Sequence, residues 1–359
     1  MKRVSKVLTF SLFIALVLSI SSCDLLGFGT SILEPEPFTP FQIEPDFFAV
    51  DGGMSDNERS TFVIDVGNDR VAGCIHMKIV CGWGVPDYAR VINDRVYICS
   101  CGMPGAKPPR ELWSITPSTG SSRRIALPYP SAEDPAYLAK ANKIVIQSPW
   151  NLTVIDFATD TVTQSCPISD EFFSIFETTD GNVYALHATP ESRMLARLTF
   201  NPFSITDLTP ARSYPVGRLH DGIAVELPNG NIVVNDAGAD QPQITLYSPT
   251  EGRIINTKAF TYEGVSVQHN NKYPSCLQMY NNGNVLLVGH GYGDEDLWET
   301  GISIHDPETL EIKGWITGEY VTPSFYVRRD KLYCVGDSHI YVRDLKTAGY
   351  PLLTTIELK

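Results

Sequence analysis

The sequence is poor in charged residues and lacks any long helical pattern. Only 19% of its 359 residues are Asp, Glu, Lys or Arg and 43% are hydrophobic, a balance that excludes a long disordered chain. No long stretch places apolar residues at helical spacing, which excludes a coiled coil. Eight cysteines are too few, at this length, for a disulfide-dense miniprotein. The chain is long enough for one large β domain or two domains of ordinary size.

Basic residues are also scarce. The chain has 28 Lys and Arg against 41 Asp and Glu, a formal net charge of −13 at pH 7. Binding to nucleic acid or to anionic lipid requires clustered Lys and Arg. The composition therefore argues against either as the main partner, and we predict no nucleic-acid partner.

Motifs for metal, redox or nucleophilic chemistry are missing as well. The sequence has no C-x-x-C and no G-x-S-x-G, and its seven histidines are scattered singly, so we predict no zinc centre and no catalytic residues. Seven cysteines remain beyond Cys23, which leaves at least one unpaired. Cys99 and Cys101 share one face of a continuous strand, whereas Cys74 and Cys81 are candidates for a bridge across a turn.

The N-terminus combines positive charge with a short apolar run. Lys2, Arg3 and Lys6 precede residues 7–20, which carry no charge and are too few to span a bilayer. The segment LSISSC, which ends at Cys23, resembles the lipobox of bacterial lipoproteins. That resemblance implies diacylation of the Cys23 thiol, cleavage before it and acylation of the new amine. An ordinary signal peptide and an uncleaved anchor are the alternatives.

Most of the remaining chain repeats one unit, in which a polar turn precedes an apolar strand. The Asn-Gly and Asp-Gly turns among them supply the positive φ that tight hairpins need. Six anchor residues mark these strands at steps of 48, 39, 49, 53 and 47 residues, and a further step of 48 back from the first anchor reaches Phe48. The anchors are Val96, Ile144, Val183, Ile232, Val285 and Leu332.

A second hairpin pattern alternates with the first. It appears at residues 63–65, 154–156, 304–306 and 342–344, where a short strand ending in Asp precedes a turn. Two hairpins per unit give four strands per unit, and such a unit of 40–50 residues is typical of a β-propeller. The pieces DGNVYAL and VIDFATDTV resemble the repeats of YVTN-type and quinoprotein-like propellers of bacterial envelope proteins, at the level of the superfamily.

We therefore predict an all-β, seven-bladed β-propeller with four-stranded blades. Six or eight blades, and a pair of β-sandwiches, are the alternatives. Three regions follow: a lipoprotein signal peptide at 1–22, the acylated Cys23 with a Pro-rich tether at 23–41, and the propeller at 42–359. Pro-rich segments are extended and semi-rigid, and the end of this tether is a candidate strand.

Ligands of propellers commonly meet the loops that join the second strand to the third and one blade to the next, which share one face. The most chemically rich such loop is HGYGDEDLWET, residues 290–300. Its aromatic and His side chains are candidates for a wall on which a ligand stacks, and its carboxylates for oxygen ligands of Ca²⁺. A solvated acidic loop with aromatic lids over the core is the alternative. The candidate ligand-binding residues are His290, Tyr292, Asp294, Glu295, Asp296 and Trp298, with Asp236 and Asp240 on the same rim.

These features favour a lipid-anchored, non-enzymatic binding scaffold in a bacterial cell envelope. The propeller would face the periplasm or the exterior and hold a protein, a peptide or a glycan. We predict no cofactor, with Ca²⁺ as the one candidate ion. The alternatives are a metal-dependent propeller hydrolase or lyase, and an outer-membrane protein assembly factor.

Overall fold

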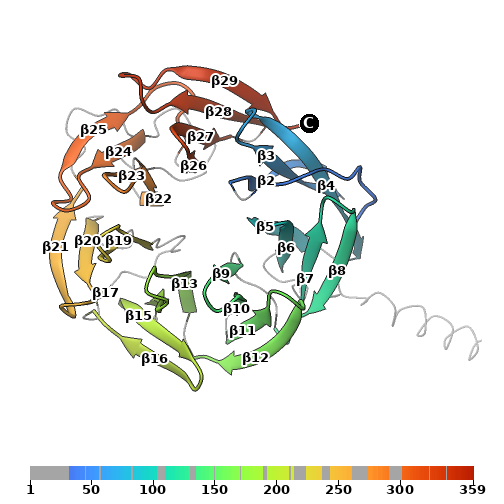
Figure 1. Ribbon diagram of the computed structural model, residues 1–359, viewed down its shortest axis with the longest axis horizontal. Coiled ribbons are helices and arrows are strands. Elements are labelled where there is room, and N and C mark those ends of the chain that lie inside the picture. Colours follow the sequence, from blue (N-terminus) through green and yellow to red (C-terminus); the bar gives the residue numbers. More distant parts are fainter. Residues whose placement is uncertain are drawn as a thin grey trace, which may run out of the picture.

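The structure, a computed structural model, is a ring of seven antiparallel sheets (Figure 1). Each sheet is one blade, so the predicted seven-bladed propeller is confirmed. Among the described residues no helix is long and apolar enough to cross a membrane. The described residues are 32–44, 46–55, 58–81, 84–102, 110–129, 135–148, 150–169, 171–188, 192–209, 212–213, 224–236, 243–260, 274–280, 282–290, 301–322, 324–336 and 338–359.

The strands follow one another around the ring in chain order, apart from β1. Blade 1 contains β1 (Ile32–Pro35), β2 (Phe48–Ser55), β3 (Glu58–Asp65) and β4 (Arg70–Cys81). Blade 2 contains β5 (Gly84–Ile92), β6 (Arg95–Gly102), β7 (Glu111–Thr116) and β8 (Ser121–Ala126). Blade 3 contains β9 (Ala136–Leu138), β10 (Lys143–Ser148), β11 (Asn151–Asp156) and β12 (Thr161–Pro167). Blade 4 contains β13 (Glu171–Glu177), β14 (Val183–Ala188), β15 (Ser192–Phe200) and β16 (Phe203–Asp207), and β17 (Arg212–Ser213) also pairs with β15.

Blades 5 to 7 keep the same order of strands. Blade 5 contains β18 (Ala224–Glu226), β19 (Ile232–Asp236), β20 (Gln243–Ser248) and β21 (Arg253–Ala259). Blade 6 contains β22 (Pro274–Tyr280), β23 (Val285–His290), β24 (Gly301–His305) and β25 (Ile312–Ile316). Blade 7 contains β26 (Phe325–Arg328), β27 (Lys331–Val335), β28 (His339–Asp344) and β29 (Leu352–Glu357).

Burial explains why the second and third strands are the most apolar. In blade 3, β10 is buried on both faces from Ile144 to Ser148, whereas most of the outermost strand, β12, is exposed. The turns before the second strands use the residues that tolerate positive φ, such as Asn93, Asn142 and Gly181. The Asn and Asp-Gly turns of the sequence pattern therefore lie where hairpins need them.

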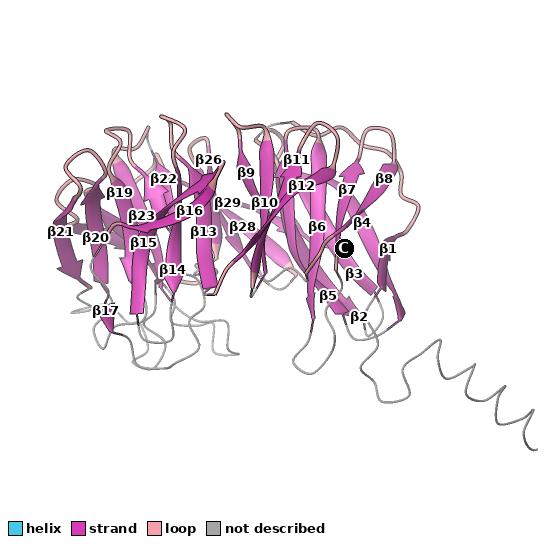
Figure 2. Ribbon diagram, turned by 90° about the horizontal axis from the view of Figure 1, so that it is seen from below, coloured by secondary structure: helices cyan, strands magenta, loops and turns pink. Residues whose placement is uncertain are grey.

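The two ends of the ring differ, as Figure 2 shows. One end, here called the turn face, carries the turns between first and second strands and between third and fourth strands. The other end, the loop face, is where second strands lead to third strands and one blade leads to the next.

Hydrogen bonds link neighbouring blades on the turn face. Glu177 accepts the Lys140 N–H at 2.7 Å, and Glu226 accepts both the N–H and the hydroxyl of Thr179 at 2.8 Å.

Each of the seven apolar clusters takes its side chains from two neighbouring blades. Between blades 2 and 3, for example, Tyr97 and Cys99 pack with Ile144, Ile146 and Ile155. A single sheet has no core of its own, so stability comes from stacking blade on blade around the ring.

A polar latch accompanies two of these clusters. The Tyr97 hydroxyl of blade 2 donates to Asp160 in a turn of blade 3 at 2.9 Å, and Arg95 pairs with the same carboxylate. Between blades 7 and 1 the Tyr333 hydroxyl donates to Asp69 at 2.7 Å. Lys331 pairs with Asp69, just as Arg95 pairs with Asp160. Burial raises the pKa of Tyr97 to about 12 and also raises the pKa of Tyr333, so both hydroxyls stay protonated donors.

The latch shows that blade 1 is built differently from the others. Asp69 lies in the β3–β4 turn, and Asp160 lies in the turn between the third and fourth strands of blade 3. Phe48 pairs with Ile64 as Ile144 pairs with Ile155, so β2 corresponds to a second strand. Within the described residues blade 1 therefore has no counterpart of the innermost strand, and β1 adds a strand at its outer edge.

Residues 36–44, here called the strap, lead from β1 to the start of β2. The Glu36 N–H donates to His76 O at 2.8 Å and the Phe41 N–H to Pro117 O at 3.1 Å, so the strap crosses from blade 1 to blade 2. Phe41 lies against Gly73, where any Cβ would overlap its ring. β1 and most of the strap lie within the residues that the sequence predicted as a tether.

Two cysteine predictions concern these strands. Cys74 and Cys81 both lie in β4, seven residues apart in one strand, so the predicted bridge across a turn is wrong. Cys99 and Cys101 lie together in β6 as predicted, and the Cys99 side chain is buried.

Removing the latch between blades 7 and 1 should destabilise the ring. Asp69→Ala removes the closer acceptor of the buried Tyr333 hydroxyl, leaves only Val66 O at 3.3 Å, and places Ala at a φ of 50°. We expect a loss of about 2–4 kcal/mol in the free energy of unfolding. Urea unfolding followed by fluorescence would measure it. Asp94→Ala, at an exposed turn position, is the control, and equal losses in both variants would refute the latch.

Candidate functional site

The structure locates two of the predicted site residues. His290 is the last residue of β23, and the backbone of Asp236 ends β19, so both lie at the loop face in adjacent blades. The placement of these two strand ends agrees with the predicted common rim. The ligand-binding role itself stays a prediction. Cys23, Tyr292, Asp294, Glu295, Asp296, Trp298 and Asp240 lie outside the described residues.

His290 is fully buried between blades 5 and 6. Its Nε2 lies 2.6 Å from Ser303 Oγ, which lies 2.7 Å from Nε2 of His305. His305 Nδ1 is 3.0 Å from the carbonyl oxygen of Leu310 and must donate to it. With His305 neutral, Ser303 donates to its bare Nε2 and accepts from His290 Nε2–H, so these hydrogen bonds fit two neutral imidazoles; Ser303 Oγ also lies 3.4 Å from Val288 O.

Burial enforces that neutrality. It lowers the pKa of His290 to about 3, with a further contribution from His305, and it also lowers the pKa of His305. The Phe260 ring meets both imidazoles edge-on, at centroid distances of 4.8 and 5.6 Å. The His290 imidazole is thus a buried, neutral side chain within the contact between blades 5 and 6 rather than part of an exposed wall.

An exposed tryptophan marks the loop face at blade 3. Only residues 149–150 connect β10 to β11, and the Trp150 side chain is 63% exposed. Its carbonyl accepts the Ile168 N–H at 3.0 Å, which ties the turn to the end of the blade. Tyr129, which follows β8 on the same face, is 37% exposed. Trp150 was not among the binding residues predicted from the sequence, although a Trp in a two-residue connection has no room to fold back.

Polar side chains are buried just beneath this tryptophan. Asn151, fully buried, donates to Thr153 at 2.8 Å and accepts from Ser165 at 2.7 Å. Gln147 Oε1 and Ser148 Oγ are buried with no hydrogen-bond partner among the described residues. Buried polar atoms normally have hydrogen-bond partners. The Gln147 and Ser148 oxygens, next to the exposed Trp150, can therefore each accept a further hydrogen bond.

A His–Asp pair occupies the same end of blade 4. His187 Nδ1 lies 2.8 Å from Asp207 Oδ1, and its ring stacks on Phe172 with centroids 4.7 Å apart. The pair resembles the oriented imidazole of a general base, but no nucleophile accompanies it among the described residues. We assign it a structural role in fixing the end of β14.

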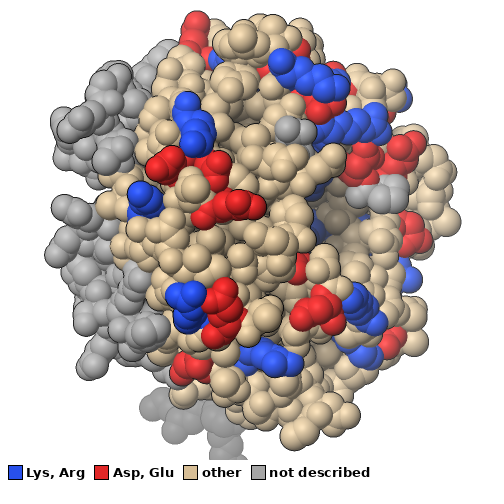
Figure 3. All heavy atoms as spheres, turned by 60° about the vertical axis from the view of Figure 1, so that its left-hand side comes forward, with Lys and Arg blue, Asp and Glu red and all other residues tan. Residues whose placement is uncertain are grey.

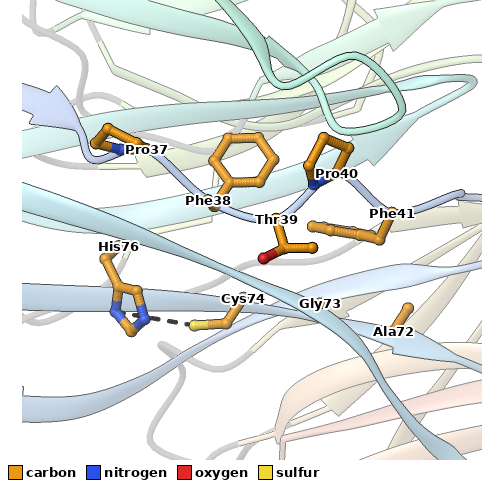
Figure 4. A pocket seen from close by; sticks show the side chains of 9 residues that line it. All are labelled: Pro37, Phe38, Thr39, Pro40, Phe41, Ala72, Gly73, Cys74 and His76. Carbon is orange, nitrogen blue, oxygen red and sulfur yellow. Dashed lines mark hydrogen bonds between the residues drawn. The ribbon is translucent and has the colours of Figure 1, made fainter.

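A groove lies beneath the strap (Figure 4). It has a volume of about 480 Å³ and is lined by strap residues Pro37 to Phe41 and by Ala72 to Cys74 and His76 of β4. His76 Nδ1 lies 2.9 Å from Ser60 Oγ and 4.0 Å from the Cys74 sulfur. Burial raises the pKa of Cys74, which makes its thiol a poor nucleophile. The groove therefore offers proline and aromatic contacts together with the polar side chains of Thr39 and His76.

The described part of the chain contains no metal centre, and the side drawn in Figure 3 shows no strongly charged patch. No group of three His, Cys, Asp or Glu side chains there could hold a metal ion. Cations and anions alternate over the side wall and turn face in Figure 3. Arg253 pairs with Glu251 at 2.6 Å and Lys313 with Glu311 at 3.3 Å.

Comparison with known proteins supports the fold and nothing finer. No protein-family model and no curated protein matches the chain. A protein from Lactobacillus plantarum is 12% identical, with a TM-score of 0.57 over 87% of this chain and 96% of that one. Hydrazine synthase of Kuenenia stuttgartiensis is 11% identical, with a TM-score of 0.53 over 76% and 86%. The β-propeller domain of Swd1 from Myceliophteria thermophila is 9% identical, with a TM-score of 0.51 over 76% and 88%.

The buried imidazoles predict that acid destabilises the fold. The pKa of His290 is about 3 in the folded protein against 6.5 for the free side chain, so the unfolded chain binds more protons between these values. Stability should therefore fall as pH drops from about 6.5 towards 3, by up to about 1.4 kcal/mol per pH unit for each such histidine.

Urea unfolding between pH 7 and pH 4 measures this slope. His290→Met keeps the Ser303–His305 hydrogen bond. It should reduce the change of unfolding free energy with pH by the equivalent of about one bound proton. The matched control His76→Gln, at an exposed histidine, should keep the pH slope of the wild type. An identical slope in wild type and His290→Met would contradict the neutral chain.

Proposed function

We propose that this chain is a lipid-anchored bacterial envelope protein whose propeller binds a protein, peptide or glycan through its loop face. The observation that carries the proposal is Trp150, which is 63% exposed at that face. Tryptophan is enriched among residues that dominate binding energy at protein interfaces, and aromatic rings also stack on sugars.

The contrast between the two faces supports this choice. The turn face has short turns joined by hydrogen bonds between blades. The connections from second to third strands differ greatly in length, from residues 149–150 in blade 3 to residues 291–300 in blade 6. A rigid ring that carries unequal connections at one end is typical of a binding scaffold. The lipobox-like segment that ends at Cys23 supports the anchor.

The anchor has a direct test. We expect the full chain, expressed in a bacterium fed an alkyne-bearing palmitate, to incorporate the label. Cys23→Ser should lose the label and accumulate as a longer precursor, because the acylated thiol is needed before cleavage. Cys74→Ser is the matched control and should remain labelled. Labelling that persists in Cys23→Ser would refute acylation at this residue.

The binding face can be tested by comparative pull-down. The acylated chain is recovered from gently solubilised envelopes and its co-purifying proteins and glycans are identified by mass spectrometry. Trp150→Ala, and separately the joint change Asp294→Asn, Glu295→Gln and Asp296→Asn, should each lower recovery of a stoichiometric partner at least tenfold. Leu353→Ala, at an exposed apolar residue of β29, should leave recovery unchanged. Equal recovery in all variants would place binding elsewhere.

A further inference from the structure

A tight turn between β25 and β26, strands of neighbouring blades (Figure 1), holds an exposed tyrosine in a strained conformation. The Val321 N–H donates to Gly318 O at 3.3 Å and closes the turn. Tyr320, the third residue of the turn, has a φ of 67°, in the left-handed region that favours glycine at this position. Tyr320 is also 42% exposed. The fold therefore holds a large, water-exposed ring at a conformational cost.

Contacts on both sides of Tyr320 fix the turn to the body of the propeller. Val321 is 2% exposed and packs in the apolar cluster between blades 6 and 7. Arg343 of β28 donates through Nη2 to Glu319 O and through Nη1 to Tyr350 O at 3.0 Å. Because the residues before and after Tyr320 are both held, its side chain leaves the turn in one defined direction.

The Tyr320 ring is the most exposed member of an aromatic stack. It lies on the Tyr341 ring of β28 with centroids 4.4 Å apart and planes inclined by 20°. The His339 ring is nearly parallel to that of Tyr341, at 6.1 Å and 23°, and its Nδ1 lies 2.8 Å from Ser338 Oγ. Gly336 leaves room for the Tyr341 ring, since a Cβ there would lie 3.4 Å from Tyr341 Cε2. Tyr341 thus covers one face of the Tyr320 ring, and the exposed surface of that ring is on its other side.

The turn itself would be satisfied by glycine at position 320. Glycine adopts a positive φ without steric cost, and the two anchors of the turn are Glu319 O and the Val321 side chain. Tyr320 gains a stacking contact with Tyr341, but much of its surface stays in water. Strained residues are concentrated at sites where ligands bind. The exposed ring is therefore better explained by a ligand than by the stability of the turn.

From this arrangement we propose that Tyr320, supported by Tyr341, is a stacking platform for a neutral sugar ring of a glycan. The C–H face of a pyranose covers an aromatic face, and its hydroxyl groups then need hydrogen-bond acceptors beside the aromatic ring. Glu319, exposed in the same turn, supplies a carboxylate that can accept them. The proposal rests on the function proposed above, because it selects the glycan among the ligands named there, and it does not involve Trp150.

Charge and shape favour a sugar over other flat ligands. The Glu319 carboxylate and the net charge of −13 oppose rings that carry phosphate, such as those of nucleotides. Proline-rich peptides dock in grooves lined by aromatic rings. Tyr320 instead offers a single open face, because its other face is stacked on Tyr341.

Isothermal titration calorimetry of the full chain tests the platform. The protein is kept in a detergent without a sugar head group, and cellohexaose, maltohexaose, chitohexaose and decaproline are titrated separately. We expect at least one of the three oligosaccharides to bind and decaproline not to bind. Tyr320→Phe keeps the ring and should retain the affinity within about threefold, whereas Tyr320→Gly should weaken it about tenfold or more. Binding of none of the oligosaccharides, or of decaproline in their place, would refute the sugar platform.

Further variants separate binding from folding. Tyr320→Ala loses the ring but keeps the strain, so Tyr320→Gly should unfold at a higher temperature than Tyr320→Ala while both bind weakly. Equal unfolding midpoints for these two variants would contradict the strain from which the platform is inferred. Leu352→Ala, at an equally exposed residue of β29, is the control and should bind as the wild type does.

Trp150→Ala distinguishes this platform from the function proposed for the loop face. The platform predicts that Tyr320→Gly loses oligosaccharide binding. Binding that is lost in Trp150→Ala and kept in Tyr320→Gly would overturn the platform and leave the binding role of the loop face standing.

Discussion

Every part of this fold depends on closing a ring of sheets that cannot stand alone. A four-stranded sheet has two faces and no interior, so each blade buries its apolar side chains only against the blades on either side. The seven apolar clusters correspond to the seven contacts between blades. If one contact opens, two sheets lose a face, and this makes the contact between the first and last blades as important as any other.

No pair of described strands is hydrogen-bonded across that contact. β29 completes blade 7 and β1 completes blade 1, so the chain ends do not share a sheet. Phe48, Tyr326 and Tyr333 pack at the junction instead. The Tyr333–Asp69 bond lies at the turn-face end of the same junction. The contact between blades 2 and 3 uses the same residue types. The ring therefore closes through a contact of the same kind as those elsewhere in it.

The regular part of this structure could be predicted from the sequence because its cause is local. Asn-Gly and Asp-Gly turns and the apolar strands after them depend on backbone conformation and on burial, which both leave a pattern in sequence. Phe48, which was predicted by extending the spacing of the repeats, also lies at the expected position in its strand. The exceptions arise from distant contacts: nothing near Ile32 indicates that it pairs with Cys81. His290 was selected for its loop, whereas its surroundings come from Phe260, Ser303 and His305.

The attachment of β1 has a mechanical consequence. Only Ile32 to Pro35 pair with β4, and the pairing starts where the chain enters the fold. Tension applied to the chain before Ile32 would open these pairs one after another, as a zipper opens, and a zipper yields at low force. The next resistance is the strap, where the Phe41 ring is seated on Gly73 and the Phe41 N–H is bonded to Pro117. A pull from this end would therefore meet a weak, extensible step before it loaded the ring, which could remain closed while the first strand peels away.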